Sequence, residues 1–198
     1  MAIFLLVSAQ SYFTREREKM RIIYLIPIGE VNQDLILYLS QQIQVIFPFS
    51  VKIKEPLPHP GYAYNTNRDQ YESDLILKEL EKADSKEVEK ILGVVDLDLY
   101  TPGLNFVFGQ AVVGGKTALI ALARLKQQFY GLPEDKNLYY SRAIKEAVHE
   151  LGHTFGLSHC KNPKCVMHFS NSLADTDYKD KFFCENCRNK LPFKSEKK

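Results

Sequence analysis

The chain has 198 residues, of which 45% are apolar, and its 26 Lys and Arg nearly balance its 24 Asp and Glu. This composition predicts a stable globular protein with a real core. The balance of charge argues against nucleic acid or an anionic membrane as the main partner. No stretch approaches the roughly 18 consecutive apolar residues of a membrane-spanning helix, so we expect no membrane span, and we expect a monomer.

Residues 1–19 contain one short apolar run, AIFLLV, which is followed by Ser-Ala. A secretory signal needs an apolar run of roughly 7 to 15 residues after a basic segment, and no Lys or Arg precedes this run. An added strand or an upstream extension therefore explains the segment better than export. Met20 directly precedes RIIYLIPIGEV, which has the pattern expected at the start of an α/β domain. Residues 1–19 are expected to be a dispensable N-terminal extension.

The segments that follow Met20 alternate between strand and helix patterns. RIIYLIP (21–27) is a β-rich run and SVKIK (50–54) alternates, so both are predicted strands. Between them, apolar residues recur at helical spacing from Asp34, and Asn32 is the predicted N-cap of that helix. EPLPHPGYAYN, with three prolines, is predicted to be a loop.

The middle of the chain predicts one helix and three strands. Residues 68–83 carry apolar residues on one face and charge on the other, which predicts a surface helix covering a sheet. ILGVVD (91–96) is a continuous apolar run, as expected of a buried central strand. NFVFGQAVV (105–113) and TALIALARL (117–125) flank a Gly-Gly-Lys turn and are expected to form a hairpin. The second of these runs is also compatible with a helix.

An amphipathic helix is predicted over residues 139–157, where an apolar stripe recurs at helical spacing and Gly156 is placed to end the helix. This helix carries the string HELGH. Its His149 and His153 are i and i+4 on one face, a separation at which both imidazoles reach one ion. Glu150 points about a third of a turn away, within reach of a water on the metal, which is the arrangement of the H-E-x-x-H zinc hydrolases.

His159 is the predicted third ligand. It lies three residues after Gly156, which has no Cβ and can adopt the positive φ that turns the chain back toward the metal. Three protein ligands leave the fourth zinc position open, so the pattern favours a catalytic zinc over ordinary surface or core histidines. Glu150 is expected to take the proton of a zinc-bound water that attacks a carbonyl carbon and to return it to the leaving amine. Peptide bonds suit this site, and other amides and esters fit the same chemistry.

All four cysteines, Cys160, Cys165, Cys184 and Cys187, lie in the last fifth of the chain. Their C-x4-C and C-x2-C pairs have nearly the spacing of tetrahedral four-cysteine zinc sites. A disulfide-stapled fold spreads its cysteines more widely, so the clustering favours metal and a reducing, cytoplasmic compartment. Two disulfides, or an independent zinc ribbon that contacts nucleic acid or protein, are the alternatives. We expect two Zn²⁺ per chain, one catalytic and one structural.

The string HELGHTFGLSH resembles the extended zinc signature of the metzincin peptidases, and Met167 resembles the methionine beneath the metal in that clan. The archaemetzincins are more closely similar, through HC-x4-C-x-M, the final C-x-x-C, MRIIYLIPIGEV and PGLNFVFGQA. The resemblance covers most of residues 20–190. It implies an α+β metzincin fold, with a twisted mixed β-sheet, a backing helix and an active-site helix in residues 20–156. A small zinc-stabilised C-terminal subdomain would occupy residues 157–198.

The resemblance also implies that the strand within LNFVFGQAVV borders the cleft, where a peptide or protein substrate binds by strand addition. Many secreted metzincins have a tyrosine just after the methionine, whereas this chain has His168-Phe169, so no residue is assigned to stabilise the oxyanion. We expect His168 to pack against its neighbours.

The resulting hypothesis is a zinc metallopeptidase with Glu150 as the base. Aminopeptidase-like cleavage from the amino end and internal cleavage are both compatible with this hypothesis. The alternative is a zinc-stabilised binding or scaffold protein of the same fold with little or no turnover. Glu150 favours the enzyme, because a purely structural three-histidine site does not need a carboxylate at that position.

Overall fold

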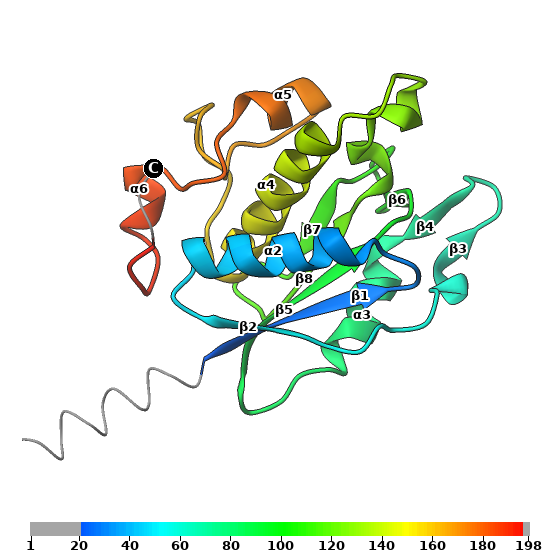
Figure 1. The fold of residues 1–198 in the computed structure, drawn as a ribbon. Helices are drawn as coiled ribbons and strands as arrows, with labels where there is room; N and C mark the ends of the chain where they lie inside the picture. The colour runs from blue at the N-terminus through cyan, green and yellow to red at the C-terminus, as the bar shows by residue number, and fades with distance from the viewer. Residues whose placement is uncertain (1–20, 196–198) are drawn as a thin grey trace, which may run out of the picture.

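The structure, a computed structural model, describes residues 21–195; the extension expected at residues 1–19 lies outside this range. Its centre is a five-stranded sheet with the strand order β2-β1-β5-β8-β7 (Figure 1). The strands are β1 (Ile22–Ile28), β2 (Ser50–Ile53), β5 (Val88–Val95), β7 (Gly109–Ala111) and β8 (Thr117–Ala121). Four of them are parallel, and β7 pairs antiparallel with β8 at one edge. The predicted mixed sheet is confirmed.

Two of the three interior strands, β1 and β5, are buried on both faces, which is why IIYLIPI and ILGVV read as continuous apolar runs. Leu25 and Leu92 face one side of the sheet, whereas Ile26 and Ile91 face the other. The central strand predicted from ILGVVD is therefore confirmed.

Helices cover both faces of the sheet (Figure 1). The helices α2 (Gln33–Ile46) and α4 (Lys136–Thr154) pack on one face and on each other, and α3 (Ser73–Glu81) packs on the opposite face. The side chain of Asn32 caps α2 by accepting a hydrogen bond from the Leu35 N–H at 3.0 Å, as predicted. No helix within residues 21–195 has both the length and the apolar character needed to cross a membrane.

The helix predicted over residues 68–83 was wrong in its first part. Residues Gln70–Glu72 form β4, which belongs to a small sheet of order β3-β4-β6 with β3 (Tyr64–Asn65) and β6 (Leu99–Tyr100). The Tyr71 N–H donates to the Asp98 carbonyl at 3.0 Å, so pairing with a distant segment overrides the helical pattern. A short 3₁₀ helix, η1 (Gly61–Ala63), precedes this sheet.

The hairpin predicted between residues 105–113 and 117–125 exists, but its strands are shorter. Regular pairing joins only β7 and β8, and Val107 adds an isolated bridge to Leu99. After β8 the chain forms two 3₁₀ helices, η2 (Ala123–Leu125) and η3 (Gln127–Tyr130). Strand rather than helix is thus confirmed for the first half of TALIALARL.

Beyond α4 the chain contains only two short helices, α5 (Leu173–Tyr178) and α6 (Glu185–Arg188), within its described part. Leu157, Met167 and Phe183 from this region join the same hydrophobic core as α2 and α4. The division into residues 20–156 and 157–198 stays a prediction.

Candidate active site

Three histidines converge beside the edge of the sheet. His149 and His153 project from α4, and His159 comes from the loop that follows the helix. One ring nitrogen from each histidine lies within 4.8 Å of the others. The Nε2 atoms of His149 and His153 are 3.1 Å apart, close to the roughly 3.3 Å between two nitrogens on one tetrahedral zinc.

The other ring nitrogens of His149 and His153 fix the orientation of these two imidazoles. His149 Nδ1 donates to the Val166 carbonyl at 2.8 Å, and His153 Nδ1 donates to the Leu157 carbonyl at 2.7 Å. Both Nε2 atoms are then acceptors that face each other, an arrangement that a shared cation stabilises. Burial lowers the pKa of all three histidines, most strongly that of His149, so their neutral, ligating form is favoured.

Gly156 ends α4 and redirects the chain, as predicted from the sequence. Its φ is +84°, and its N–H donates to the His153 carbonyl at 2.9 Å. The Leu157 N–H donates to the Gly152 carbonyl at 3.1 Å, which completes a Schellman motif. This turn brings the chain back so that His159 faces the two helical histidines.

Gly152, the glycine inside HELGH, allows the Met167 side chain to approach the backbone of α4 closely. A Cβ at this position would lie 2.4 Å from the Met167 sulfur, and Met167 is fully buried there. The methionine singled out in the sequence therefore packs directly under the helical turn that carries His149 and His153. His168 contacts Cys160 through a 3.0 Å hydrogen bond from its Nδ1 to the carbonyl, and it does not line the cleft described below.

Glu150 lies on the same face of α4 as the histidines and is 5% exposed. Its carboxylate makes no hydrogen bond or ion pair with any residue in the described range. Burial raises its pKa well above the usual value, the neighbouring Glu146 adds to the shift, and Lys179 opposes it. A carboxylate of this kind is a stronger base than an exposed one.

A cleft of about 500 Å³ opens in front of the three histidines and both glutamates. One wall is β7, the outermost strand of the sheet, which confirms that the strand within LNFVFGQAVV is an edge strand beside the cleft. The lining is otherwise mainly apolar: Leu104, Phe106, Val107, Phe108, Ala111, Val113 and Phe169. Among the described residues that line it there is no Lys or Arg.

Glu146 is a cleft residue that the sequence analysis missed. It precedes His149 by three residues, so Glu146, His149, Glu150 and His153 share one face of the helix at i, i+3, i+4 and i+7. Glu146 could have been identified from the sequence, because it lies in a polar stripe with this spacing opposite the apolar stripe of the same helix. Lys179, whose Nζ pairs with the Glu146 carboxylate at 3.0 Å, is far away in sequence and carried no such signal.

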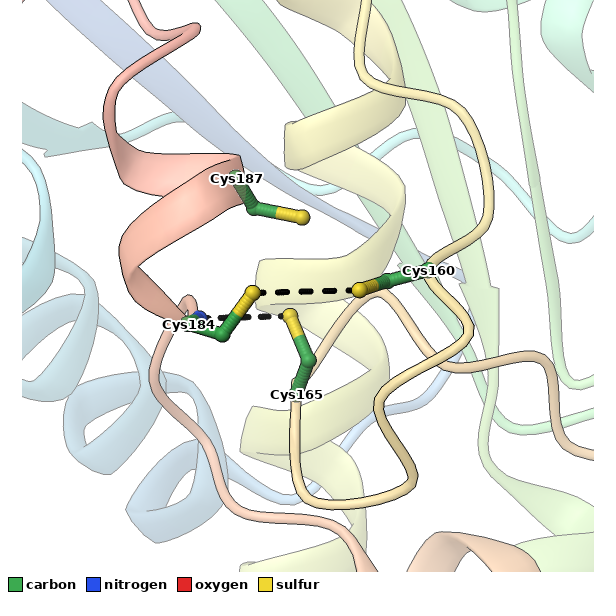
Figure 2. Close-up of side chains that lie close together, drawn as sticks. All are labelled: Cys160, Cys165, Cys184 and Cys187. Atoms are coloured by element: carbon green, nitrogen blue, oxygen red, sulfur yellow. Dashed lines mark hydrogen bonds between the residues drawn. The ribbon is translucent and has the colours of Figure 1, made fainter.

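The four cysteines lie together between the loop after α4 and α6 (Figure 2). Their sulfurs are all within 4.8 Å of one another, and the Cys160 and Cys184 sulfurs are 3.8 Å apart. Two sulfurs on one tetrahedral zinc are about 3.8 Å apart, whereas a disulfide requires about 2.05 Å. All four are free thiols, and burial raises the pKa of Cys165 to about 11, so a cation is needed to hold the Cys165 side chain as a thiolate.

The two clusters share a backbone connection. The Cys160 N–H donates to the Met167 carbonyl at 2.8 Å, and Cys160 directly follows His159. Val166, whose carbonyl orients His149, donates its own N–H to the Phe182 carbonyl at 3.0 Å. The segment around Met167 thus contacts both the histidine cluster and the cysteine cluster.

Comparison with known proteins places this arrangement in a family. Residues 30–192 match the profile of peptidase family M54. The chain is 46% identical to archaemetzincin of Methanocaldococcus jannaschii over 83% of this chain and 89% of that one. It is 48% identical to archaemetzincin of Pyrococcus furiosus over 85% and 91% of the two chains. The chain belongs to peptidase family M54, the archaemetzincins.

Solved structures agree with this assignment. Archaemetzincin of Archaeoglobus fulgidus superposes with a TM-score of 0.75 at 38% identity, over 86% of this chain and 99% of that one. A zinc-dependent peptidase of Methanocorpusculum labreanum gives a TM-score of 0.78 at 31% identity, over 85% and 99%. The metzincin fold is confirmed, and the cysteine cluster fits its zinc-bearing C-terminal part. As an archaemetzincin, this chain is a zinc metallopeptidase whose substrates are peptides or proteins.

Proposed function

We propose that this archaemetzincin hydrolyses peptide bonds with Glu150 as general base and with two zinc ions per chain. His149, His153 and His159 would hold the catalytic ion, and the four cysteines would hold the structural one. The observation that carries the proposal is the convergence of three imidazoles, two of them oriented by backbone carbonyls, beside a buried carboxylate that has no hydrogen-bond partner within residues 21–195. The thiols support a reducing, cytoplasmic setting; a monomer without a nucleic-acid partner stays a prediction.

The chemistry divides between the ion and the chain. When bound, zinc acts as a Lewis acid that polarises the scissile carbonyl and makes water acidic near neutral pH. Glu150 accepts a proton from the attacking water and delivers it to the departing amine nitrogen. The apolar lining excludes competing water.

The substrate would lie extended along β7. This strand pairs with β8 on one side only, so the backbone on its other side is available for strand addition beside the cleft. Strand addition would place the peptide backbone in front of the histidines, because Gly109 and Glu150 line the same cleft.

An aminopeptidase-like activity is the finer part of the proposal. Among the described residues that line the cleft, the acidic ones are Glu146 and Glu150, and there is no Lys or Arg. Such a cleft favours a positively charged amino terminus and repels a carboxylate, which argues against cleavage from the carboxyl end.

The test is metal-dependent hydrolysis of a peptide library with zinc counted in the same sample. We expect close to two zinc ions per chain, loss of hydrolysis on chelation, and its return when zinc is added back. Products should be shortened from the amino end. If the protein carries two zinc ions but cleaves no peptide, the proposed hydrolysis is wrong and the binding or scaffold function is favoured.

A further inference from the structure

We propose that Glu146 binds the α-ammonium group of the peptide substrate and so fixes which bond is cut; this inference rests on the proposed function of the three-histidine site. Glu146 lines the cleft one helical turn before Glu150, and its side chain is only 4% exposed. Burying a carboxylate is costly unless it is paired, and Glu146 has a buried cationic partner, Lys179.

The Glu146 carboxylate is held in a defined orientation through one oxygen. Its Oε1 forms an ion pair with Lys179 Nζ at 3.0 Å and accepts a hydrogen bond from Thr176 Oγ1 at 3.2 Å. Lys179 has no exposed side-chain area, so the pair is shielded from solvent screening. Both contacts involve Oε1, which leaves Oε2 as an acceptor for a ligand in the cleft.

Lys179 and Thr176 are themselves fixed, because α5 is fastened to α4. Arg142 donates two hydrogen bonds of 2.7 Å to the Asp177 carboxylate, and Lys145 donates to the Thr176 and Asp177 carbonyls at 3.0 Å. The carboxylate of Glu146 is therefore preorganised before any substrate arrives, which lowers the entropic cost of binding.

The spacing fits removal of a single residue. The Cα atoms of residues i and i+4 are separated by about 6 Å along a helix, so side chains that project in parallel from Glu146 and Glu150 end about this far apart. In a peptide, the amino nitrogen and the first carbonyl carbon are two bonds, about 2.5 Å, apart. A hydrogen bond of about 2.8 Å from the ammonium to Glu146 then leaves the first carbonyl within reach of a water held by Glu150. Each further residue would add about 3.3 Å and overshoot this position.

The decisive variant is Glu146→Gln, which keeps the shape of the side chain and removes its charge. Peptides are supplied in two forms, with a free amino terminus and with an N-acetylated one. We expect wild type to have a higher kcat/KM for the free form than for the acetylated form. In the variant this ratio should fall at least tenfold, mainly because KM for the free form rises. Hydrolysis of the acetylated form should fall much less than hydrolysis of the free form, because only the free form carries the ammonium group. Glu134→Gln, an exposed glutamate outside the cleft, is the matched control.

A binding measurement separates this role from turnover. In a Glu150→Gln background, calorimetry with the same two peptide forms should show tighter binding of the free form, and adding Glu146→Gln should abolish that difference. If Glu146→Gln does not fold, Glu146→Asp decides: drawing the carboxylate back by one methylene should lower the free-form preference several-fold. An unchanged preference would overturn the assignment.

The outcomes for the two proposals are distinct. If wild type cleaves both forms equally well, hydrolysis stands and the Glu146 assignment falls. If Glu146→Gln lowers cleavage of both forms equally, Glu146 is only the structural partner of Lys179. If zinc-loaded wild type cleaves neither form, the proposed function itself fails, and calorimetry still reports whether Glu146 selects the free amino terminus.

Discussion

Gly109 on the edge strand and Glu150 on the active-site helix are in direct contact. A methyl group added to Gly109 would lie 2.6 Å from Cγ of Glu150 and 2.7 Å from its Oε1. No real Cβ comes so close to another heavy atom, so the glycine sets the distance between β7 and the carboxylate. The strand that would hold the substrate and the side chain that would activate water are thereby positioned by the same contact.

Replacing Gly109 with alanine should displace the Glu150 carboxylate and leave the metal sites intact. A misplacement of about 1 Å at a catalytic group costs up to about 100-fold in rate, so kcat should fall about 10- to 100-fold. Zinc content should equal that of wild type. Gly61→Ala is the control, because a Cβ there meets nothing within 4 Å. Wild-type kcat in Gly109→Ala would show that the contact does not position Glu150.

Replacing Cys184 with serine should remove one zinc ion per chain and lower the melting temperature by about 10 °C or more, because a four-cysteine ion contributes directly to folding. The measurements are metal analysis and calorimetry, with His159→Ala as the matched variant. That variant should also lose one ion, but with a much smaller change in melting temperature, because its site is open on one side. Retention of both ions in Cys184→Ser would contradict the four-cysteine assignment.

Lys90 connects the central strand to the end of the active-site helix. Its Nζ donates to the Gly115 carbonyl at 2.7 Å and to the Thr154 carbonyl at 2.8 Å, and burial lowers its pKa. Lys90→Met keeps the length of the side chain but leaves two carbonyls unpaired, so the free energy of unfolding should fall by about 2 to 4 kcal/mol. Denaturant titration measures it.

Lys116→Met is the control for that experiment. Lys116 pairs with Asp84 at 2.6 Å, but both side chains are nearly half exposed. An exposed pair of this kind contributes less than about 1 kcal/mol. Equal losses in the two variants would show that Lys90 is not the anchor of the helix end.

The histidine cluster predicts acid sensitivity in the chelated protein. Burial lowers the pKa of His149 well below 6.5, so below that pH the unfolded chain binds a proton that the folded chain excludes. The free energy of unfolding should therefore fall as the pH drops below about 6.5, by about 1.4 kcal/mol per pH unit from His149 alone. Glu150 acts in the opposite sense, because its raised pKa lets the folded chain take up a proton first.

The Glu150→Gln variant isolates the histidine effect, since it removes the opposing titration. Chelated Glu150→Gln should lose stability more steeply than chelated wild type between pH 6.5 and 5, as measured by denaturant titration. Zinc-loaded protein should resist the same acidification until the ion leaves. A flat profile for the chelated variant would mean that the histidines are not held neutral by burial.

Much of this arrangement was predictable from the sequence because its determinants are local. Helical periodicity placed His149, Glu150 and His153 on one helix, and the conformational freedom of Gly156 explained how His159 returns to them. The continuous apolar run ILGVVD could be recognised as a central strand, because a strand buried on both faces needs apolar residues at successive positions.

The unpredicted parts depend on contacts between distant segments. Residues 70–72 have a helical pattern but pair with β6, and no local signal announces that partner. The contact of Gly109 with Glu150 and the pairing of Glu146 with Lys179 appear only when β7 and α5 are packed against α4. Sequence patterns identify the functional side chains and their spacing along the chain. The tertiary fold determines which residues from other elements contact those side chains.

The central claim is that Glu150 activates water at a three-histidine zinc site. The most direct measurement compares zinc-loaded wild type with Glu150→Gln, counting zinc per chain and identifying cleavage products of a peptide library by mass spectrometry. We predict equal zinc content, amino-terminal cleavage by wild type, and a rate reduced at least about 100-fold in the variant. Undiminished cleavage by a Glu150→Gln protein that retains its zinc would contradict the account.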